Sequence, residues 1–215
     1  MQQQILAAAT RLFAARGFEG TPLSAIAAEV GVAKPSLLYH YPSKDALREA
    51  VLGNLLAHWS EVLPELLMAA TTGGQRFHAL VEAIVAFFTE DPNRARLLLR
   101  EMLDRPDALR KLFAEHVSPW LGVLAEYIRL GQREGRIWAG LDPEAYLLNI
   151  IHQIVSGIAV SEVFTELYPA SSGADDDAND AANSRRELQT RHIEEMVRMA
   201  HSSLFLPRSL PDRKN

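Results

Sequence analysis

The sequence predicts an all-α protein of about nine helices. Apolar residues recur at helical spacing along most of the chain, whereas no strand-like alternation and no internal repeat emerges. Proline, glycine and N-capping residues punctuate this pattern where helices should begin and end. With 215 residues the chain can bury a large core, and we expect one domain at residues 1–50 and a helical domain at residues 51–206.

The first predicted helix covers residues 3–16 and places its apolar residues on one face. Gly17 is expected to end this helix in a Schellman-type turn, which lets Phe18 fold back on Phe13. The helix should therefore brace the two that follow it.

Two short helices joined by a tight turn come next. Thr21 is predicted to cap the first, and Pro22 to occupy its first position, where a missing N–H costs nothing. Gly31 supplies the left-handed turn that ends it, and a second helix runs over residues 34–40 until Pro42 stops it. A glycine turn between two short helices is typical of a helix-turn-helix, whose second helix presents its N-terminal side chains to the major groove.

Basic, hydroxyl and aromatic side chains crowd this motif. Lysine can contact phosphates, whereas serine and histidine can exchange hydrogen bonds with bases. The alternative is an ordinary surface pair of helices in an all-α protein, with its tyrosines half-buried. The side chains that lie within about three helical turns are Lys34, Ser36, Tyr39, His40 and Lys44.

The segments RLFAARGFEGTPLSAIAAEVGV and KPSLLYHYPSKDAL cover nearly all of residues 5–50 and resemble the N-terminal DNA-binding domain of the TetR family of bacterial transcriptional repressors. The resemblance implies an all-α homodimer that binds a small molecule in its C-terminal domain and then leaves DNA. It also implies a recognition helix at residues 34–40 and a phosphate contact at the start of the next helix. The expected DNA-binding residues are Thr21, Lys34, Pro35, Ser36, Leu38, Tyr39, His40 and Lys44.

Charge is distributed unevenly along the chain. The formal net charge is −5, yet residues 1–50 carry five basic and four acidic side chains, which gives this segment +1. The remainder is therefore at −6. A slightly basic N-terminal segment in an otherwise acidic chain agrees with local phosphate contacts in a protein whose remaining surface repels DNA.

A long helix capped by Ser43 should connect the two domains, with a kink or an end near Pro64. Asp91 and Asp142 each precede a proline and are predicted to cap later helices. Those helices are expected at residues 75–89, 92–103, 107–133 with a bend at Pro119, 143–168 and 184–206.

Two segments are expected to lack regular structure. Residues 170–183 are acidic and of low complexity, which favours a mobile loop. Residues 207–215 are predicted to be a disordered tail.

Aromatic residues in the predicted C-terminal bundle are candidates for an effector pocket, because ligand sites often form between the helices of a bundle. Aromatic residues at helical spacing also fill ordinary cores, and His152 could equally be a core or interface residue. The candidate pocket residues are Trp59, Phe77, Phe88, Met102, Trp120, Tyr127 and His152.

Apolar residues cover almost the whole circumference of the predicted helix at residues 143–168. A helix in a monomer needs only one apolar stripe, which faces the core. We therefore expect it to form a four-helix dimer interface together with the last helix. The alternative is a central core helix of a monomer. The candidate interface residues are Ile150, Ile154, Gly157, Ile158, Ile193, Met196 and Val197.

Motifs for other chemistry are missing from the sequence. It contains no phosphate-binding glycine loop, no G-x-S-x-G and no H-E-x-x-H, so we expect no enzyme activity, no cofactor and no metal site. Residues 175–177 are three aspartates without the glycine and terminal glutamate of a calcium loop. Arg100 and Glu101 lie on an apolar helix, so one of them could enter a cavity, or both could form salt bridges.

These observations predict a dimeric DNA-binding regulator, a repressor released from a palindromic operator by a small apolar or aromatic molecule. The alternative is a helical-bundle enzyme or scaffold whose helix pair only resembles a DNA reader. No apolar run approaches the roughly 18–20 residues of a membrane span, and the N-terminus has no signal-peptide core. Without cysteine as well, the chain is expected in the cytoplasm.

Overall fold

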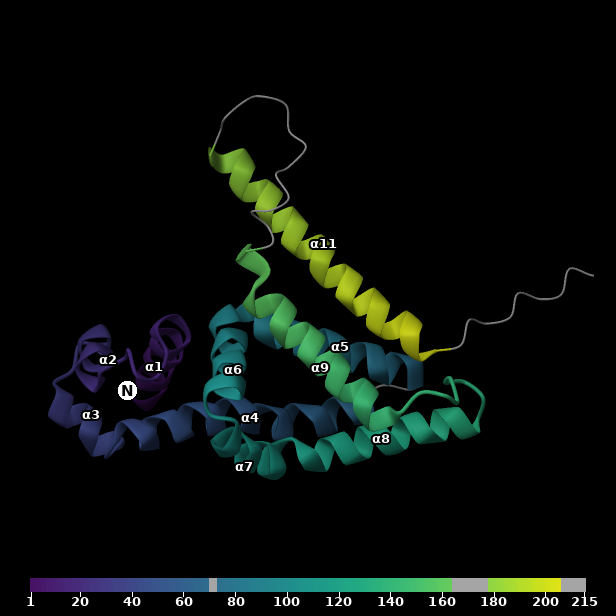
Figure 1. The fold of residues 1–215 in the computed structure, drawn as a ribbon, viewed down its shortest axis with the longest axis horizontal. Helices are drawn as coiled ribbons and strands as arrows, with labels where there is room; N and C mark the ends of the chain where they lie inside the picture. The colour runs from purple at the N-terminus through teal and green to yellow at the C-terminus, as the bar shows by residue number, and fades with distance from the viewer. Residues whose placement is uncertain (70–72, 164–177, 206–215) are drawn as a thin grey trace, which may run out of the picture. The chain divides into compact units, whose positions relative to one another are not determined.

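The computed structural model describes residues 1–69, 73–163 and 178–205, which are almost entirely helical (Figure 1). The predicted all-α fold class is confirmed. No helix in these ranges is long and apolar enough to cross a membrane. The helices are α1 (Gln2–Arg16), α2 (Leu23–Val30), α3 (Lys34–His40), α4 (Lys44–Ala69), α5 (Gly73–Glu90), α6 (Pro92–Asp104), α7 (Pro106–His116), α8 (Ser118–Arg133), α9 (Pro143–Ala159) and α11 (Ala178–Leu204).

The chain divides into two compact units. Unit 1 consists of Met1–Glu65, Ala86–Trp120 and Val155–Val160, and unit 2 consists of Leu66–Val85, Leu121–Ile154 and the described residues from Ser161 on. Unit 1 therefore contains the whole predicted DNA-binding domain together with α6 and α7. The predicted boundary at residue 50 stays a prediction, and the predicted tail at residues 207–215 lies outside the described residues.

The core of unit 1 forms around α1. The rings of Phe13 and Phe18 lie 5.5 Å apart, so the predicted fold-back of Phe18 is confirmed. Gly17 has φ 73° and ψ 169°, a conformation almost exclusive to glycine but not the left-handed turn of a Schellman motif. The buried cluster contains Ile5, Ala8, Ala9, Leu12 and Phe13 of α1 and Leu97 of α6.

The turn between α2 and α3 follows the prediction. Gly31 has φ 75° and ψ 28°, which is the left-handed conformation, and its N–H donates to the carbonyl oxygen of Ala28 at 3.1 Å. Apart from Gly31 itself and its two chain neighbours, no described residue has an atom within 4 Å of the position that a Cβ would take at Gly31. Backbone conformation, and not space, therefore favours glycine at this position.

Three predicted helix starts are confirmed. The N–H of Ala46 donates to Ser43 Oγ at 3.0 Å at the start of α4. Asp91 and Asp142 accept hydrogen bonds from first-turn N–H groups of α6 and α9. Pro64 lies inside α4, so this helix does not end there.

The segment predicted as one bent helix over residues 107–133 forms two helices. α7 ends at His116, and α8 begins at Ser118, directly before Pro119. Proline has no N–H to donate to the preceding turn, so it suits the first turn of a new helix better than the interior of a longer one.

Part of the segment predicted as an acidic loop is helical. α11 begins at Ala178, so residues 178–183 are helical and the prediction of a loop over them is wrong. Three alanines in this stretch are strong helix formers, and the low-complexity interpretation overlooked them. α9 ends at Ala159, and the rest of the predicted loop, with the three aspartates, lies outside the described residues.

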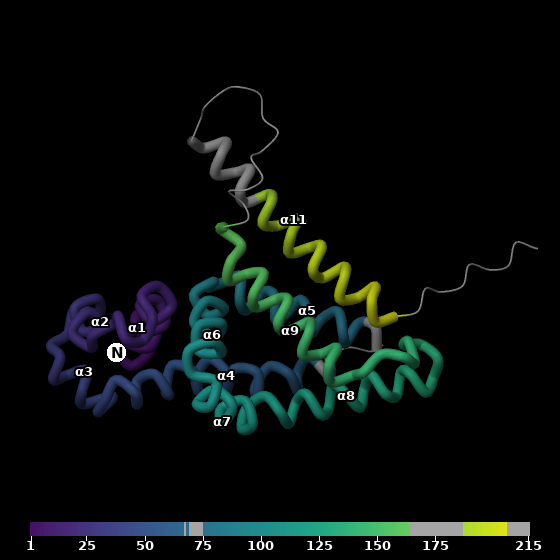
Figure 2. Tube along the Cα trace, in the orientation of Figure 1, coloured from purple at the N-terminus to yellow at the C-terminus, as the bar shows by residue number. Residues whose placement is uncertain are grey.

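Within unit 2 the end of α11 lies beside the start of α9 (Figure 2). The buried Tyr146 hydroxyl of α9 donates to the carbonyl oxygen of Ala200 in α11. Phe77 of α5 packs against Tyr146 and Phe205, with ring centroids 6.0 and 5.9 Å apart. These contacts join α5, α9 and the end of α11 in one core.

Candidate DNA-binding surface and effector cavity

The recognition helix α3 has one buried and one exposed face. Leu37 is fully buried in the cluster around α1, which fixes α3 on the core. Tyr39 is 88% exposed, whereas the side chain of Tyr41 is half-buried and burial raises its pKa. The alternative interpretation, in which both tyrosines are half-buried, therefore holds only for Tyr41.

The exposed face of α3 carries the chemistry predicted for base contacts. The described structure leaves the side chains of Lys34, Pro35 and Ser36 exposed and those of Leu38 and His40 half-buried. The His40 ring meets the Tyr39 ring edge-on at 5.5 Å, so the two aromatic groups are adjacent. Along its seven residues α3 thus offers the cation of Lys34, the hydroxyls of Ser36 and Tyr39 and the imidazole of His40.

Thr21 does not belong to this surface. Its side chain is fully buried, and its hydroxyl is shared between the carbonyl oxygens of Leu12 at 3.1 Å and Gly17 at 2.8 Å. The N-cap of α2 is Pro22, so the predictions that Thr21 caps α2 and contacts DNA are both corrected. Thr21 instead ties the start of α2 to the end of α1.

Lys44 lies at the predicted position but already has contacts within the chain. Its Nζ lies 4.3 Å from the centroid of the Phe18 ring and donates to the carbonyl oxygen of Glu19 at 3.4 Å. A cation held over an aromatic ring remains available to a stronger anionic partner, because such exposed contacts are weak. Its phosphate contact stays a prediction.

Two residues of α6 and the residue that caps its C-terminus, Arg105, hold the elements around the recognition helix. Glu101 is buried and pairs with Arg48 of α4 at 2.7 Å, so Glu101 enters the interior without lining a cavity. Arg105 pairs with Glu19 at 2.5 Å, and its guanidinium lies 4.1 Å from the Phe18 ring centroid. These contacts join α6 to the α1–α2 loop and to the start of α4.

The third of these residues, Arg100, donates to the carbonyl oxygen of Ala14 at 2.8 Å, near the end of α1. The sequence singled out Arg100 and Glu101 because charged residues on an apolar helix need partners. It did not indicate Arg48 as the partner, because 53 residues separate Arg48 from Glu101.

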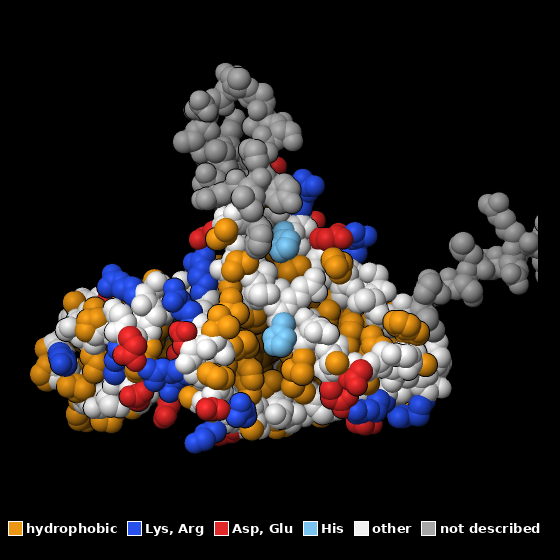
Figure 3. Space-filling model, viewed as in Figure 1, with side chains coloured by type: hydrophobic (Ala, Val, Ile, Leu, Met, Phe, Trp, Pro, Cys, Tyr) orange, Lys and Arg blue, Asp and Glu red, His pale blue; other side chains and the backbone are white. Residues whose placement is uncertain are grey.

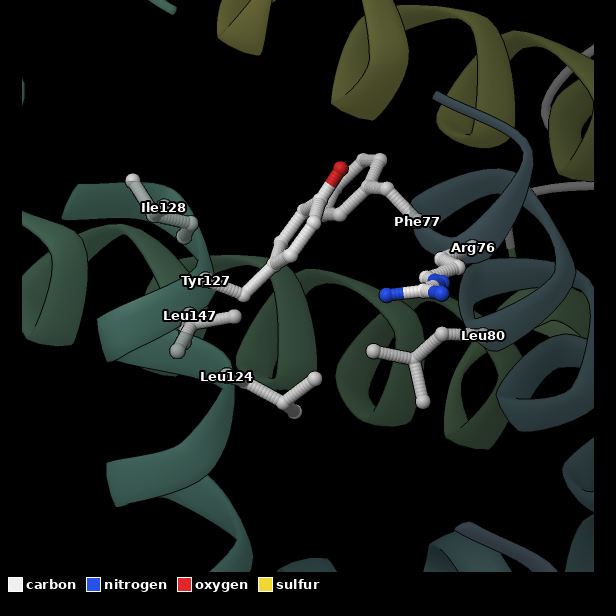
Figure 4. Close-up of a pocket in the computed structure, with 7 residues that line it drawn as sticks. All are labelled: Arg76, Phe77, Leu80, Leu124, Tyr127, Ile128 and Leu147. Atoms are coloured by element: carbon white, nitrogen blue, oxygen red, sulfur yellow. The ribbon is translucent and has the colours of Figure 1, made fainter. Parts of the chain in front are cut away.

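A small cavity in unit 2 brings together two of the seven predicted pocket residues. Phe77 of α5 and Tyr127 of α8 line it, and Figure 4 shows their side chains reaching toward each other from these two helices. Its volume is about 10 Å³, the room of a single water molecule. The other lining residues are Arg76, Leu80, Leu124, Ile128 and Leu147.

The remaining predicted pocket residues have other surroundings. Trp59, Phe88, Met102 and Trp120 belong to unit 1, and the side chain of His152 in unit 2 is exposed. The Trp59 ring lies 5.0 Å from Phe87, and the His58 ring stacks on Phe87 at 4.5 Å. Trp59 therefore belongs to an aromatic cluster in unit 1, and a pocket role for these residues stays a prediction.

The predicted interface residues are largely covered within one chain. Ile150, Ile154, Ile158 and Met196 are buried, and Gly157, Ile193 and Val197 are half-buried. Part of the apolar surplus of α9 therefore serves the core of the chain itself. Figure 3 shows further hydrophobic side chains on the surface alongside α9, and Leu148 of α9 and Met199 of α11 are exposed.

No group of three or more His, Cys, Asp or Glu side chains that could hold a metal ion occurs among the described residues. The geometry presents an exposed recognition helix in unit 1 and a small, mostly apolar cavity in unit 2.

Two family models match more than half of the chain. The model described as "Bacterial regulatory proteins, tetR family" matches residues 5–51, and the one described as "Tetracyclin repressor-like, C-terminal domain" matches residues 75–197. They correspond to the helix-turn-helix and to most of the remaining helices.

Curated relatives match part of the chain. The chain is 34% identical to the nucleoid occlusion factor SlmA of Pasteurella multocida over 98 residues, 45% of this chain and 49% of that protein, about half its length. It is 30% identical to the HTH-type transcriptional regulator LmrA of Bacillus subtilis over 133 residues, 60% of this chain and 71% of that protein.

Solved structures have the same fold. The fatty acid degradation regulator FadR from Bacillus halodurans superposes with a TM-score of 0.69 and 16% identity, over 93% of this chain and 94% of that one. The ketosteroid transcriptional regulator KstR2 of Mycobacterium tuberculosis superposes with a TM-score of 0.67 and 14% identity, over 96% and 95%. At this identity the likeness concerns the fold alone.

Proposed function

The chain belongs to the TetR family of bacterial regulatory proteins, and we propose that it is a homodimeric repressor released from a palindromic operator by a small molecule. TetR-family regulators are DNA-binding, ligand-responsive transcription factors, and their domains point to a non-enzymatic regulator. An operator as target implies a location in the cytoplasm. The observation that carries the proposal is the two-sided α3, with Leu37 buried and Tyr39 88% exposed.

DNA recognition is assigned to the exposed side chains of α3. Ser36, Tyr39 and His40 would contact base edges, while Lys34 and Lys44 would contact phosphates. Pro35 and Leu38 would supply apolar contact, for example to a thymine methyl group. With a net charge of only +1 in residues 1–50, few phosphate contacts are available, so specificity should rely on base contacts.

The dimer is expected to use the outer faces of α9 and α11. Leu148 and Met199 are large apolar side chains exposed on these helices, in the part of the chain that the structure describes. A dimer would place two copies of α3 on half-sites one helical turn apart, about 34–36 Å. The twofold symmetry of the protein would then explain a palindromic operator.

The effector is expected to be a mostly apolar or aromatic molecule that binds in unit 2. At about 10 Å³ the cavity is far smaller than the roughly 300–1,000 Å³ of ligand sites, so binding requires an opened conformation. A ligand that selects an opened state with lower operator affinity would release DNA. The coupling must be reciprocal and is typically about 5–150-fold.

The test is fluorescence polarisation with duplexes from the region upstream of the gene, against a scrambled duplex of equal length. A preferred palindrome bound by two chains at moderate salt would support the proposal. Equal affinity for the scrambled duplex would reject sequence-specific binding. A small-molecule panel added to the complex then tests release, because an effector must lower affinity for the preferred duplex.

A further inference from the structure

The Phe18 ring, which follows the end of α1, lies beside three cationic side chains. The Nζ atom of Lys44 is 4.3 Å from the ring centroid, and the guanidinium carbons of Arg105 and Arg48 are 4.1 and 5.4 Å from it. Phe18 is itself held by Phe13, whose ring centroid is 5.5 Å away. One aromatic ring thus gathers cations from the start of α4 and the end of α6.

Lys44 is the cation of this group that follows most closely on the recognition helix. A lysine side chain is long and flexible, so a phosphate contact must first fix its rotamers at a cost in entropy. The Phe18 ring and the carbonyl oxygen of Glu19, 3.4 Å from Nζ, hold the ammonium in place before DNA arrives. An ammonium has three N–H donors, so this arrangement leaves donors for a phosphate.

Arg105 engages the acidic side chains around Lys44. Its Nη2 lies 2.5 Å from Oε1 of Glu19, and its Nη1 lies 3.7 Å from Oδ1 of Asp45. The Glu19 side chain is 84% exposed, and its own carbonyl oxygen already contacts Lys44, so its carboxylate has room to reach the ammonium once Arg105 is removed. A carboxylate on Lys44 would oppose a phosphate there, because like charges at close range repel.

We propose that Phe18 and Arg105 are positioning residues for the phosphate contact of Lys44. The ring fixes the ammonium, and the guanidinium occupies the carboxylate of Glu19, so that Lys44 stays available to DNA. This proposal rests on the proposed function, because it concerns the same DNA contact. It brings into DNA binding a residue from beyond the predicted domain at residues 1–50, since Arg105 lies at the end of α6.

The role of the ring is tested by fluorescence polarisation at low salt, with the preferred operator and with the scrambled duplex. Phe18→Leu keeps an apolar side chain against Phe13 and removes the aromatic face, so we expect about threefold weaker binding. Phe18→Tyr keeps the ring and should bind as the wild type does. In a Lys44→Ala background Phe18→Leu should have no further effect, because the ring acts through the ammonium. Circular dichroism verifies that each variant is folded.

The role of the guanidinium is tested by changing both partners of its ion pair. Arg105→Met should weaken binding about threefold, because it releases the Glu19 carboxylate to pair with Lys44. Adding Glu19→Gln should restore the affinity, since the amide carries no charge. A purely structural role of Arg105 would not be rescued in this way. Arg110→Met, which breaks the exposed pair with Asp107, is the matched control and should leave the affinity unchanged.

The proposal would be overturned by losses that do not depend on Lys44. If Phe18→Leu or Arg105→Met weakens binding equally in the Lys44→Ala background, that residue acts on DNA or on the fold directly. No loss in either variant, or no rescue by Glu19→Gln, also contradicts it. A phosphate contact is independent of sequence, so both duplexes should give the same factors. Equal wild-type affinity for the two duplexes would reject the proposed function, yet the scrambled duplex would still test the positioning of Lys44.

Discussion

Arg48 of α4 and Glu101 of α6 form a buried ion pair, with 2.7 Å between Nη1 and Oε2 and side chains that are 6% and 5% exposed. Arg48 lies one turn into α4, the helix that follows the recognition helix α3. The pair therefore joins the helix after α3 to α6, within unit 1. Replacing both partners of such a pair with apolar side chains is often neutral for stability, whereas removing one partner is strongly destabilising.

Glu101→Ala should destabilise the protein by about 3–5 kcal/mol, because it leaves the buried Arg48 charge with only the more distant carboxylate of Asp45, at 3.9 Å. Replacing both residues, Arg48→Met with Glu101→Leu, should cost less than Glu101→Ala alone, since no buried charge remains. Urea denaturation followed by circular dichroism measures both. Asp107→Ala is the control, because it breaks an exposed pair with Arg110 and should change stability little. A double variant less stable than Glu101→Ala would contradict this account.

Lys44→Ala should weaken binding to all duplexes alike and reduce the slope of log affinity against log salt by about one unit. The reason is that one phosphate contact, and no base contact, is lost. Polarisation titrations across a salt series measure the slope, with Lys111→Ala, a change at an exposed lysine of α7, as the matched control. An unchanged slope would mean that Lys44 stays with Phe18 and Glu19 in the complex.

Tyr39→Ala and Ser36→Ala should instead change which operators are preferred. Each removes a side chain from the exposed face of α3, and a lost base contact typically costs about 1–3 kcal/mol at its own position in the site. Affinities for a set of operators with single base changes would reveal the relaxed position. A uniform loss over all of them would assign these residues to the DNA backbone.

Leu148→Glu should convert the dimer into folded monomers, detected by light scattering with an unchanged circular dichroism spectrum. A buried carboxylate in the interface would be unpaired, whereas the exposed position tolerates it in the monomer. Leu130→Glu is a close control, since Leu130 of α8 is 43% exposed and Leu148 is 44% exposed. Ile154→Asp is no substitute, because Ile154 is buried within one chain and its change would unfold the core. A dimer that persists in Leu148→Glu would exclude this face of α9.

Acidification should weaken the aromatic cluster of unit 1. Burial and the Arg94 guanidinium lower the pKa of His58, against opposing effects of Glu61 and Glu90. In the window from the ordinary value of 6.5 down to the lowered pKa, the unfolded chain binds the proton more readily than the folded chain. The contribution of His58 to stability is therefore present at neutral pH and falls as the pH drops through this window.

Urea denaturation at pH 7.5 and pH 5.5 measures this effect. His58→Phe should reduce the loss of stability between these two pH values, because phenylalanine can stack on Phe87 but does not titrate. An equal loss in both proteins would assign the pH dependence to other groups.

Local chemistry made much of the fold predictable from the sequence. The Gly31 turn and the starts of α4, α6 and α9 depend on a left-handed backbone or on a capping side chain beside a first turn, so they can be recognised within a few residues. The same holds for the exposure of Lys34, Ser36 and Tyr39 on α3, since these polar side chains crowd one short helix in the sequence. The all-α class and the helix-turn-helix follow from these features.

Tertiary structure alone decided the roles that depend on distant partners. Thr21 looked like a cap, but its hydroxyl is taken by Leu12 and Gly17, and Glu101 found its partner 53 residues away in Arg48. Aromatic and isoleucine residues have the same helical spacing in a core, a pocket or an interface. Only packing assigned Trp59 to an aromatic cluster, Phe77 and Tyr127 to the cavity and Ile154 to the interior of one chain. The physical reason is that spacing selects the face of a helix, whereas the neighbour on that face is chosen by the whole fold.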